Sequence, residues 1–243
     1  MKHWLILTSI FIFLNLSAQE NFITFKILKQ LNLSEHNCMM SLIVSKVIPN
    51  NPEESIYVIP EIVKGDVTFF ELNSHILIVN SKTGEIKNKY FESSKTNEWY
   101  SDAIRLDKIT IDTARYYITD NIRAFGIRIF YYGSSKPNPY SNETISLFIK
   151  SKDSLKKILN NYDVMDYGGE WDTNCFGEFI KKTKTLSILS KKSNSYYDIL
   201  VNNKITETKN FEDSNGNCQQ KEKTSSKKTV LKFNGNRYKE SVL

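Results

Sequence analysis

The sequence is poor in the residues that most enzymes use for acid–base and metal chemistry. Its 243 residues include three histidines and three cysteines, and His36 and His75 are the only histidines beyond the first twenty positions. It contains no GxSxG nucleophile motif, no P-loop and no dinucleotide-binding glycine motif. The two later histidines have no familiar metal-ligand spacing. These absences argue against serine hydrolases, nucleotide-dependent enzymes and His-liganded metalloenzymes, and we expect no cofactor and no metal.

Glycine and proline are also scarce, at 9 and 5 residues, whereas tyrosine and phenylalanine number 13 and 14. Aromatic residues favour strands over helices. After residue 18 no apolar stretch approaches the roughly 20 residues that a membrane-spanning helix needs. The composition therefore predicts a β-rich protein that does not span a membrane.

The first 18 residues have the three parts of a secretory signal peptide. Lys2 and His3 precede an apolar segment at residues 4–14, and the small residues Ser17 and Ala18 follow it. The sequence therefore predicts a signal peptide at residues 1–18 and an exported protein, periplasmic or extracellular. Residues 19–243 are expected to form a single all-β domain, with a possible sub-boundary near residue 150.

The net charge of +6 belongs to the second part of the chain. Residues 150–243 carry 18 Lys and Arg against 12 Asp and Glu, whereas the preceding residues are balanced at 15 of each. A basic surface can meet acidic polysaccharide, anionic lipid or nucleic acid, or it can simply be a solvated surface. Because export separates the protein from nucleic acid, we expect an unknown protein or an envelope polysaccharide as the partner.

The clearest strand covers Arg123–Tyr132. One of its faces is wholly apolar, and we expect it to be core; its members are Phe125, Ile127, Ile129 and Tyr131. Short β-branched and aromatic runs separated by turn residues recur on both sides of it. The pattern predicts an all-β fold of antiparallel strands, either a β-sandwich or an incomplete propeller-like arrangement.

Several segments are less certain or carry special signals. Glu20–Cys38 fits a short helix or a first strand, and four successive apolar residues at 76–79 predict a strand buried on both faces. Asp153–Tyr162 has helical spacing, but its neighbours favour a return strand. Turns are expected at Gly168-Gly169 and Asn202-Asn203, and the Asn-Gly pair at 234–235 predicts a final hairpin.

Two segments resemble known classes of protein. The hairpin HILIVNSKTGEIKNKYF resembles one repeat of a quinoprotein-type β-propeller, without a second copy. TLSILSKKSNSYYDILV and LKFNGNRYKE resemble the ends of exported, uncharacterised bacterial β-domain proteins. The second resemblance implies an exported location and a β fold, and it implies no activity.

The three cysteines are Cys38, Cys175 and Cys218. Cys175 and Cys218 both lie in polar, turn-like sequence in the same third of the chain, and an oxidising compartment favours pairing. We therefore predict a Cys175–Cys218 disulfide and a free Cys38. His36 is close to Cys38 in sequence, but that spacing alone does not make a nucleophile and base pair.

Two groups of acidic residues invite chemical interpretations. Glu170 and Asp172 flank Trp171, as carboxylates do in some glycosidases, but a solvated strand end is the better explanation. Residues 212–217 are acidic and amide-rich but lack the spacing of an EF-hand, which favours a plain turn.

The opposite face of the central strand is the best candidate for binding. Arg128, Phe130 and Tyr132 share that face, and Tyr140 follows in a long polar loop. Arginine combined with aromatic residues is typical of binding hot spots. The alternative is burial of this face under a second sheet.

The leading hypothesis is a non-enzymatic binding protein of the bacterial envelope or exterior. One alternative is a hydrolase of cell-envelope polymer that uses carboxylates such as Glu170 and Asp172. Another is an exported inhibitor or immunity-type protein. An enzyme requires an enclosed pocket with carboxylates, whereas a binding protein requires an exposed aromatic surface.

Overall fold

A computed structural model describes residues 22–66 and 68–241. The expected signal peptide lies outside the described residues. A helix covers residues 22–30 and short helical turns follow at η1 (Glu35–Asn37), η2 (Met40–Leu42) and α2 (Ser94–Asn97). The strands are β1 (Val44–Ile48), β2 (Asn51–Gly65), β3 (Phe70–Asn80), β4 (Ile86–Glu92), β5 (Tyr100–Ser101), β6 (Ile104–Tyr117), β7 (Arg123–Gly133), β8 (Tyr140–Ser151), β9 (Ser154–Trp171), β10 (Gly177–Ser193), β11 (Tyr196–Glu212), β12 (Cys218–Phe233) and β13 (Tyr238–Ser241).

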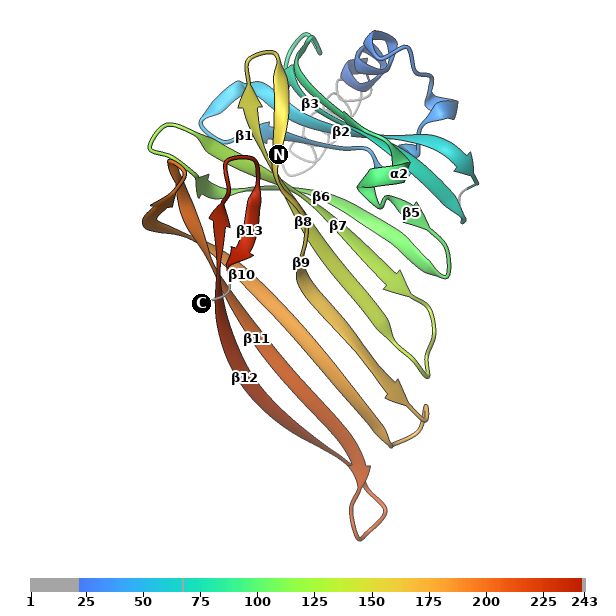
Figure 1. The fold of residues 1–243 in the computed structure, drawn as a ribbon. Helices are drawn as coiled ribbons and strands as arrows, with labels where there is room; N and C mark the ends of the chain where they lie inside the picture. The colour runs from blue at the N-terminus through green and yellow to red at the C-terminus, as the bar shows by residue number, and fades with distance from the viewer. Residues whose placement is uncertain (1–21, 67, 242–243) are drawn as a thin grey trace, which may run out of the picture.

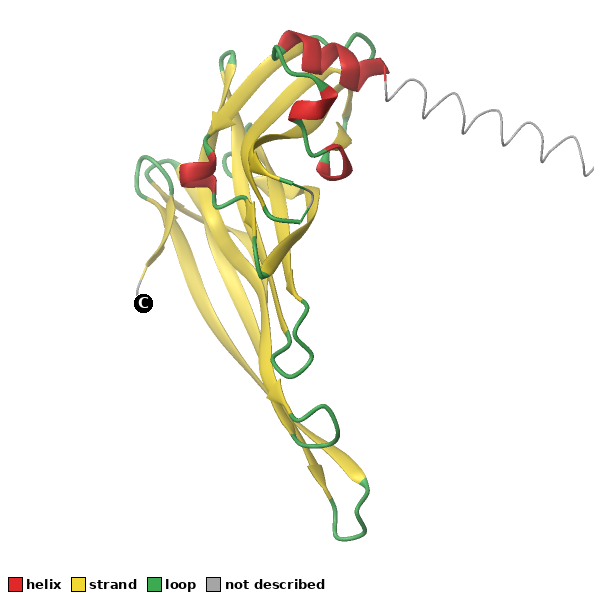
Figure 2. Cartoon of the chain, turned by 90° about the vertical axis from the view of Figure 1, so that its right-hand side faces the viewer, coloured by secondary structure: helices red, strands yellow, loops and turns green. Residues whose placement is uncertain are grey.

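These strands form one open sheet of 13 strands, which confirms the predicted all-β, antiparallel fold. From β6 to β13 each strand pairs with the next strand of the chain, and β1 to β4 form a second such run. The two runs meet at a single parallel bridge between Lys89 of β4 and Ser154 of β9. The sheet is elongated: the N-terminal strands lie at one end and β10–β12 extend far from them (Figures 1 and 2).

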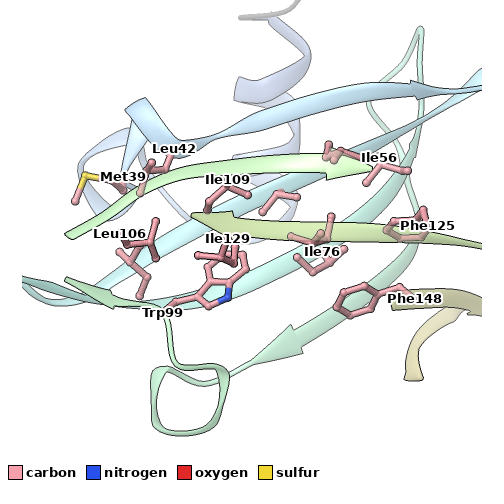
Figure 3. Close-up of a cluster of buried hydrophobic side chains, with 14 of the residues drawn as sticks. Met39, Leu42, Ile56, Ile76, Trp99, Leu106, Ile109, Phe125, Ile129 and Phe148 are labelled. Atoms are coloured by element: carbon pink, nitrogen blue, oxygen red, sulfur yellow. The ribbon is translucent and has the colours of Figure 1, made fainter. Parts of the chain in front are cut away.

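The N-terminal run packs across β6, β7 and β8 in two layers. Their facing apolar side chains form one buried cluster (Figure 3), which includes Ile76, Trp99, Ile127 and Phe148. The helix at 22–30 covers the other side of β2 and β3 with a second cluster that includes Ile27, Ile59 and Leu77. Because β3 is covered on both sides, residues 76–79 are all buried, as predicted.

The alternation in β7 is also confirmed. Phe125, Ile127 and Ile129 are buried in the core, and Tyr131 packs against it. Residues 154–171 form one strand, so the strand interpretation of Asp153–Tyr162 is right and the helical one is wrong. The final hairpin, β12–β13, is present as well.

The structure corrects the turns expected at Gly168-Gly169 and Asn202-Asn203. Both pairs lie inside continuous strands, β9 and β11. We call residues 165–184 and 202–229 the tail: there β9–β12 continue far beyond the core. Strands exposed on both faces do not need apolar residues at every second position, so their sequences contain polar pairs that are typical of turns.

A disulfide joins Cys175 and Cys218 in the tail, and Cys38 is a free, buried thiol, as predicted. Cys175 lies in the turn between β9 and β10, and Cys218 is the first residue of β12. Disulfides of this kind form in oxidising compartments.

Candidate ligand-binding surface

The structure separates the four predicted contact residues. Arg128 is half-buried and is held by two carboxylates: its Nε donates to Asp112 at 2.9 Å and its Nη1 to Glu143 at 3.0 Å. Phe130, partly buried, lies between Lys108 and Glu143 in the register of the sheet. Because two carboxylates already neutralise its charge, the Arg128 side chain stabilises the pairing of neighbouring strands and is not free to bind a ligand.

Asp112 anchors this arrangement. Burial alone would raise the pKa of its carboxyl, but hydrogen bonds from the Ala114 N–H, the Tyr116 hydroxyl and Arg128 outweigh burial and lower it. Asp112 therefore stays ionised and holds Arg128 across β6 and β7.

Tyr132 and Tyr140 lie on opposite faces of the sheet. Tyr140 pairs with Gly133 and shares its face with Tyr131, whereas Tyr132 belongs to the Arg128 face and is 46% exposed. Burial and the nearby carboxylates of Asp163 and Asp166 raise the pKa of Tyr140. Of the four residues, only Tyr132 is an open aromatic side chain on the predicted face.

Three aromatic residues from β9 and β10 join Tyr132. The register places Tyr132, Ser141 and Tyr167 side by side on neighbouring strands. Phe179 of β10 stacks on Tyr167, with ring centroids 6.2 Å apart and 8° between the ring planes. Trp171 ends β9 on the same face. We call Tyr132, Tyr167, Trp171 and Phe179 the aromatic surface.

Two glycines hold Phe179 in place. A Cβ atom at Gly169 would lie 2.5 Å from the Phe179 ring, and one at Gly177 would lie 2.9 Å from it. The ring therefore lies flat over both glycine backbones, where any larger residue would lift it. Of the pair Gly168-Gly169, which suggests a turn in the sequence, Gly169 serves this close approach.

The aromatic surface lines a cleft of about 490 Å³, whose other lining residues are mostly polar. The loop between β7 and β8 forms one wall and is tied down by the Trp171 N–H, which donates to the Pro137 carbonyl at 2.7 Å. The polar side chains of the lining are Ser134, Ser135, Lys136, Thr208, Asn210 and Gln220.

Two polar atoms of this lining have no hydrogen-bond partner among the described residues. They are Trp171 Nε1, a donor, and Asn210 Oδ1, an acceptor, and both are buried. An unsatisfied buried polar group costs about 1–3 kcal/mol. Because neither atom has accessible surface, a ligand hydroxyl or a water could reach them only if the side chains that cover them moved.

A larger cleft of about 750 Å³ lies on the other face of the tail. Four of its charged side chains form two ion pairs: Lys209 lies 2.6 Å from Glu178, and Lys223 lies 3.9 Å from Glu207. Half of its lining residues have charged side chains. The aromatic cleft is smaller but has the chemistry of a binding site.

The residues considered for catalysis do not form a site. Glu170 is exposed and faces Glu178 across the strands, and Asp172 accepts a hydrogen bond from the Asn174 N–H at 2.9 Å within a turn. Burial and the nearby Glu61 raise the pKa of the Cys38 thiol to about 11, which keeps the thiol protonated at neutral pH. Among residues 22–66 and 68–241, no three His, Cys, Asp or Glu side chains cluster as metal ligands.

The acidic turn at 212–217 is held by hydrogen bonds to one of its own carboxylates. The Asp213 carboxylate accepts hydrogen bonds from the Asn215 and Asn217 N–H groups and from the Gln219 amide. These hydrogen bonds lower the pKa of Asp213, and those from the two backbone N–H groups have the largest effect. This is the plain turn that the sequence favours.

The comparisons with known protein families, curated proteins and solved structures found no match to this chain. The resemblance of its C-terminal segments to exported β-domains therefore stays a prediction. None of the helices in the described part of the chain is long and apolar enough to cross a membrane.

Sequence reasoning found Tyr132 but missed Tyr167, Trp171 and Phe179. The segment YGGEW places Tyr167 and Trp171 at even spacing around a glycine, which is the signal of one strand face. Phe179 could be joined to them only by knowing the pairing of β9 with β10.

Proposed function

We propose that this protein is an exported, non-enzymatic binding protein of the bacterial envelope or exterior. Its ligand is an extended polysaccharide that lies on the aromatic surface. The observation that carries the proposal is the cleft in which the aromatic side chains of Tyr132, Tyr167 and Phe179 lie beside the polar residues Thr208, Asn210 and Gln220.

The chemistry of a sugar ring matches this lining. A sugar presents an apolar C–H face, which packs on the negative face of an aromatic ring, and a rim of hydroxyls that both donate and accept hydrogen bonds. Thr208, Asn210 and Gln220 supply hydroxyl and amide groups beside the rings. The open cleft suits a chain that continues beyond it.

Export predicts the removal of residues 1–18. The basic, apolar and small-residue order of that segment supports it. N-terminal sequencing of the protein recovered from whole cells should begin near Gln19; recovery of an intact Met1 from the cytosol would contradict export.

Truncation of the exposed rings should weaken saccharide binding without unfolding the protein. We expect Tyr132→Ala and Tyr167→Ala each to reduce affinity by about 5- to 150-fold, because a stacked aromatic side chain contributes roughly 1–3 kcal/mol. A panel of soluble hexasaccharides of glucose, mannose and N-acetylglucosamine, titrated by calorimetry and by Trp171 fluorescence, measures this.

Tyr117→Ala is the matched control. Tyr117 is 42% exposed, close to the 46% of Tyr132, but it lies on β6 and outside the cleft. Its truncation should leave affinity unchanged. Equal losses in all three variants, or no saturable binding of any hexasaccharide, would overturn the proposal.

A further inference from the structure

The outer edge of β12 is open along most of its length. On one side β12 pairs with β11 from Cys218 to Leu231, but on the other side β13 covers only Val230–Phe233. Within the described residues, no strand pairs with the outer side of residues 218–229. Residues 218–228 are all exposed, and they would offer about 36 Å of backbone at about 3.3 Å per residue.

This open edge is strongly basic. Residues 218–228 contain four lysines and one glutamate. Cross-strand pairing with β11 places Lys221, Lys223 and Lys227 on one face of the sheet. Only Lys223 has an acidic partner, Glu207 at 3.9 Å; among the described residues the other three lysines form no ion pair. Their charge is free to meet a partner.

We propose that this edge binds an extended, acidic segment of another protein by strand addition. The partner strand would form hydrogen bonds with the free backbone N–H and C=O groups of β12. It would lie on the same side of β12 as β13, beyond the residues that β13 covers. Acidic side chains at every second position of the partner would lie on the same face of the sheet as Lys221, Lys223 and Lys227, directly across from them. This interaction is separate from saccharide binding at the aromatic surface.

A second copy of this chain does not fit the edge. Two β12 edges paired with each other would each bring three net positive charges into contact, and like charges opposite each other destabilise a sheet. The same lysines that prevent the edge from pairing with itself select an acidic strand. The occupant is therefore a different, acidic chain.

The test uses a fluorescein-labelled, eleven-residue peptide with Glu and Thr at alternate positions, titrated into the full protein by anisotropy. We expect saturable binding that weakens as salt is added. Lys221→Gln combined with Lys227→Gln should reduce affinity about tenfold, since each exposed ion pair contributes modestly. Lys29→Gln combined with Lys95→Gln removes the same charge from two helices outside the tail and should change affinity less than twofold.

Backbone pairing is tested separately from charge. A peptide methylated on alternate backbone nitrogens keeps its acidic side chains but cannot donate to the β12 carbonyls, and it should lose most of its affinity. Equal binding of the methylated peptide, equal weakening by the two lysine pairs, or no saturable binding at millimolar peptide would each overturn the proposal. So would a dimer in sedimentation that the peptide dissociates, because a second copy would then occupy the edge.

Discussion

Replacing Lys157 with methionine should cost about 3–5 kcal/mol of unfolding free energy, measured by urea denaturation at pH 7. The Lys157 ammonium pairs with the Glu92 carboxylate, and the two side chains are only 10% and 14% exposed. Methionine keeps the length of the side chain but leaves Glu92 as a buried charge without its partner. That uncompensated charge is the source of the expected loss.

This ion pair lies where the two runs of strands join. Glu92 ends β4, and Lys157 belongs to β9. The joint also has one backbone bridge and the Asn88 amide, which donates to the Lys152 carbonyl at 2.5 Å and the Ser154 carbonyl at 3.3 Å, and the Lys150–Glu54 ion pair links the two runs as well. Lys157 also lies over the ring of Tyr90, 5.6 Å from its centre. Loss of the Lys157–Glu92 ion pair should therefore weaken the attachment of the N-terminal layer to the long sheet.

Two further variants isolate the cause. Lys157→Met combined with Glu92→Met should recover most of the loss, because an apolar pair of similar volume replaces both charges. Lys82→Met removes one partner of an exposed pair, Lys82–Glu53 at 3.1 Å, and should cost less than about 1 kcal/mol. If Lys157→Met costs no more than Lys82→Met, the joint does not depend on this charge pair.

The sequence predicts a strand well where one or both of its faces are buried. β7 alternates because one side must meet the core, and β3 shows an unbroken apolar run because layers cover both of its sides. β10 and β11 lie partly in solvent on both faces, so no pattern marks them as single long strands. The Asn202-Asn203 pair of β11 therefore suggests a turn that the structure does not contain.

The candidate site was predictable only in part, for a related reason. Arg128, Phe130 and Tyr132 share a face by simple alternation, but their surroundings depend on pairing between distant segments. Asp112 and Glu143 lie on neighbouring strands, and both form ion pairs with Arg128. Phe179 reaches Tyr167 only through the register of β9 with β10. Register is set by the whole sheet, and no single strand encodes it.

Removal of the Cys175–Cys218 disulfide, by Cys175→Ser combined with Cys218→Ser, should destabilise the tail by about 4 kcal/mol. The bond spans 43 residues of sequence, and on the loop-entropy model a loop of this length stabilises the fold by about that amount. The tail depends on the link because residues 218–228 of β12 are exposed throughout and bury no apolar side chain.

The loss should be local, and amide hydrogen exchange followed by mass spectrometry can show where it falls. In the serine variant we expect faster exchange in the tail strands β10–β12 and unchanged exchange in β2 and β3, whose side chains fill the core clusters. The wild-type protein in reductant should match the variant, whereas the variant itself should not respond to reductant, because Cys38 has no disulfide partner. Unchanged exchange in the tail would show that strand pairing alone holds β9–β12 together. Faster exchange there would show that the disulfide also stabilises the aromatic surface, which is built on the same strands.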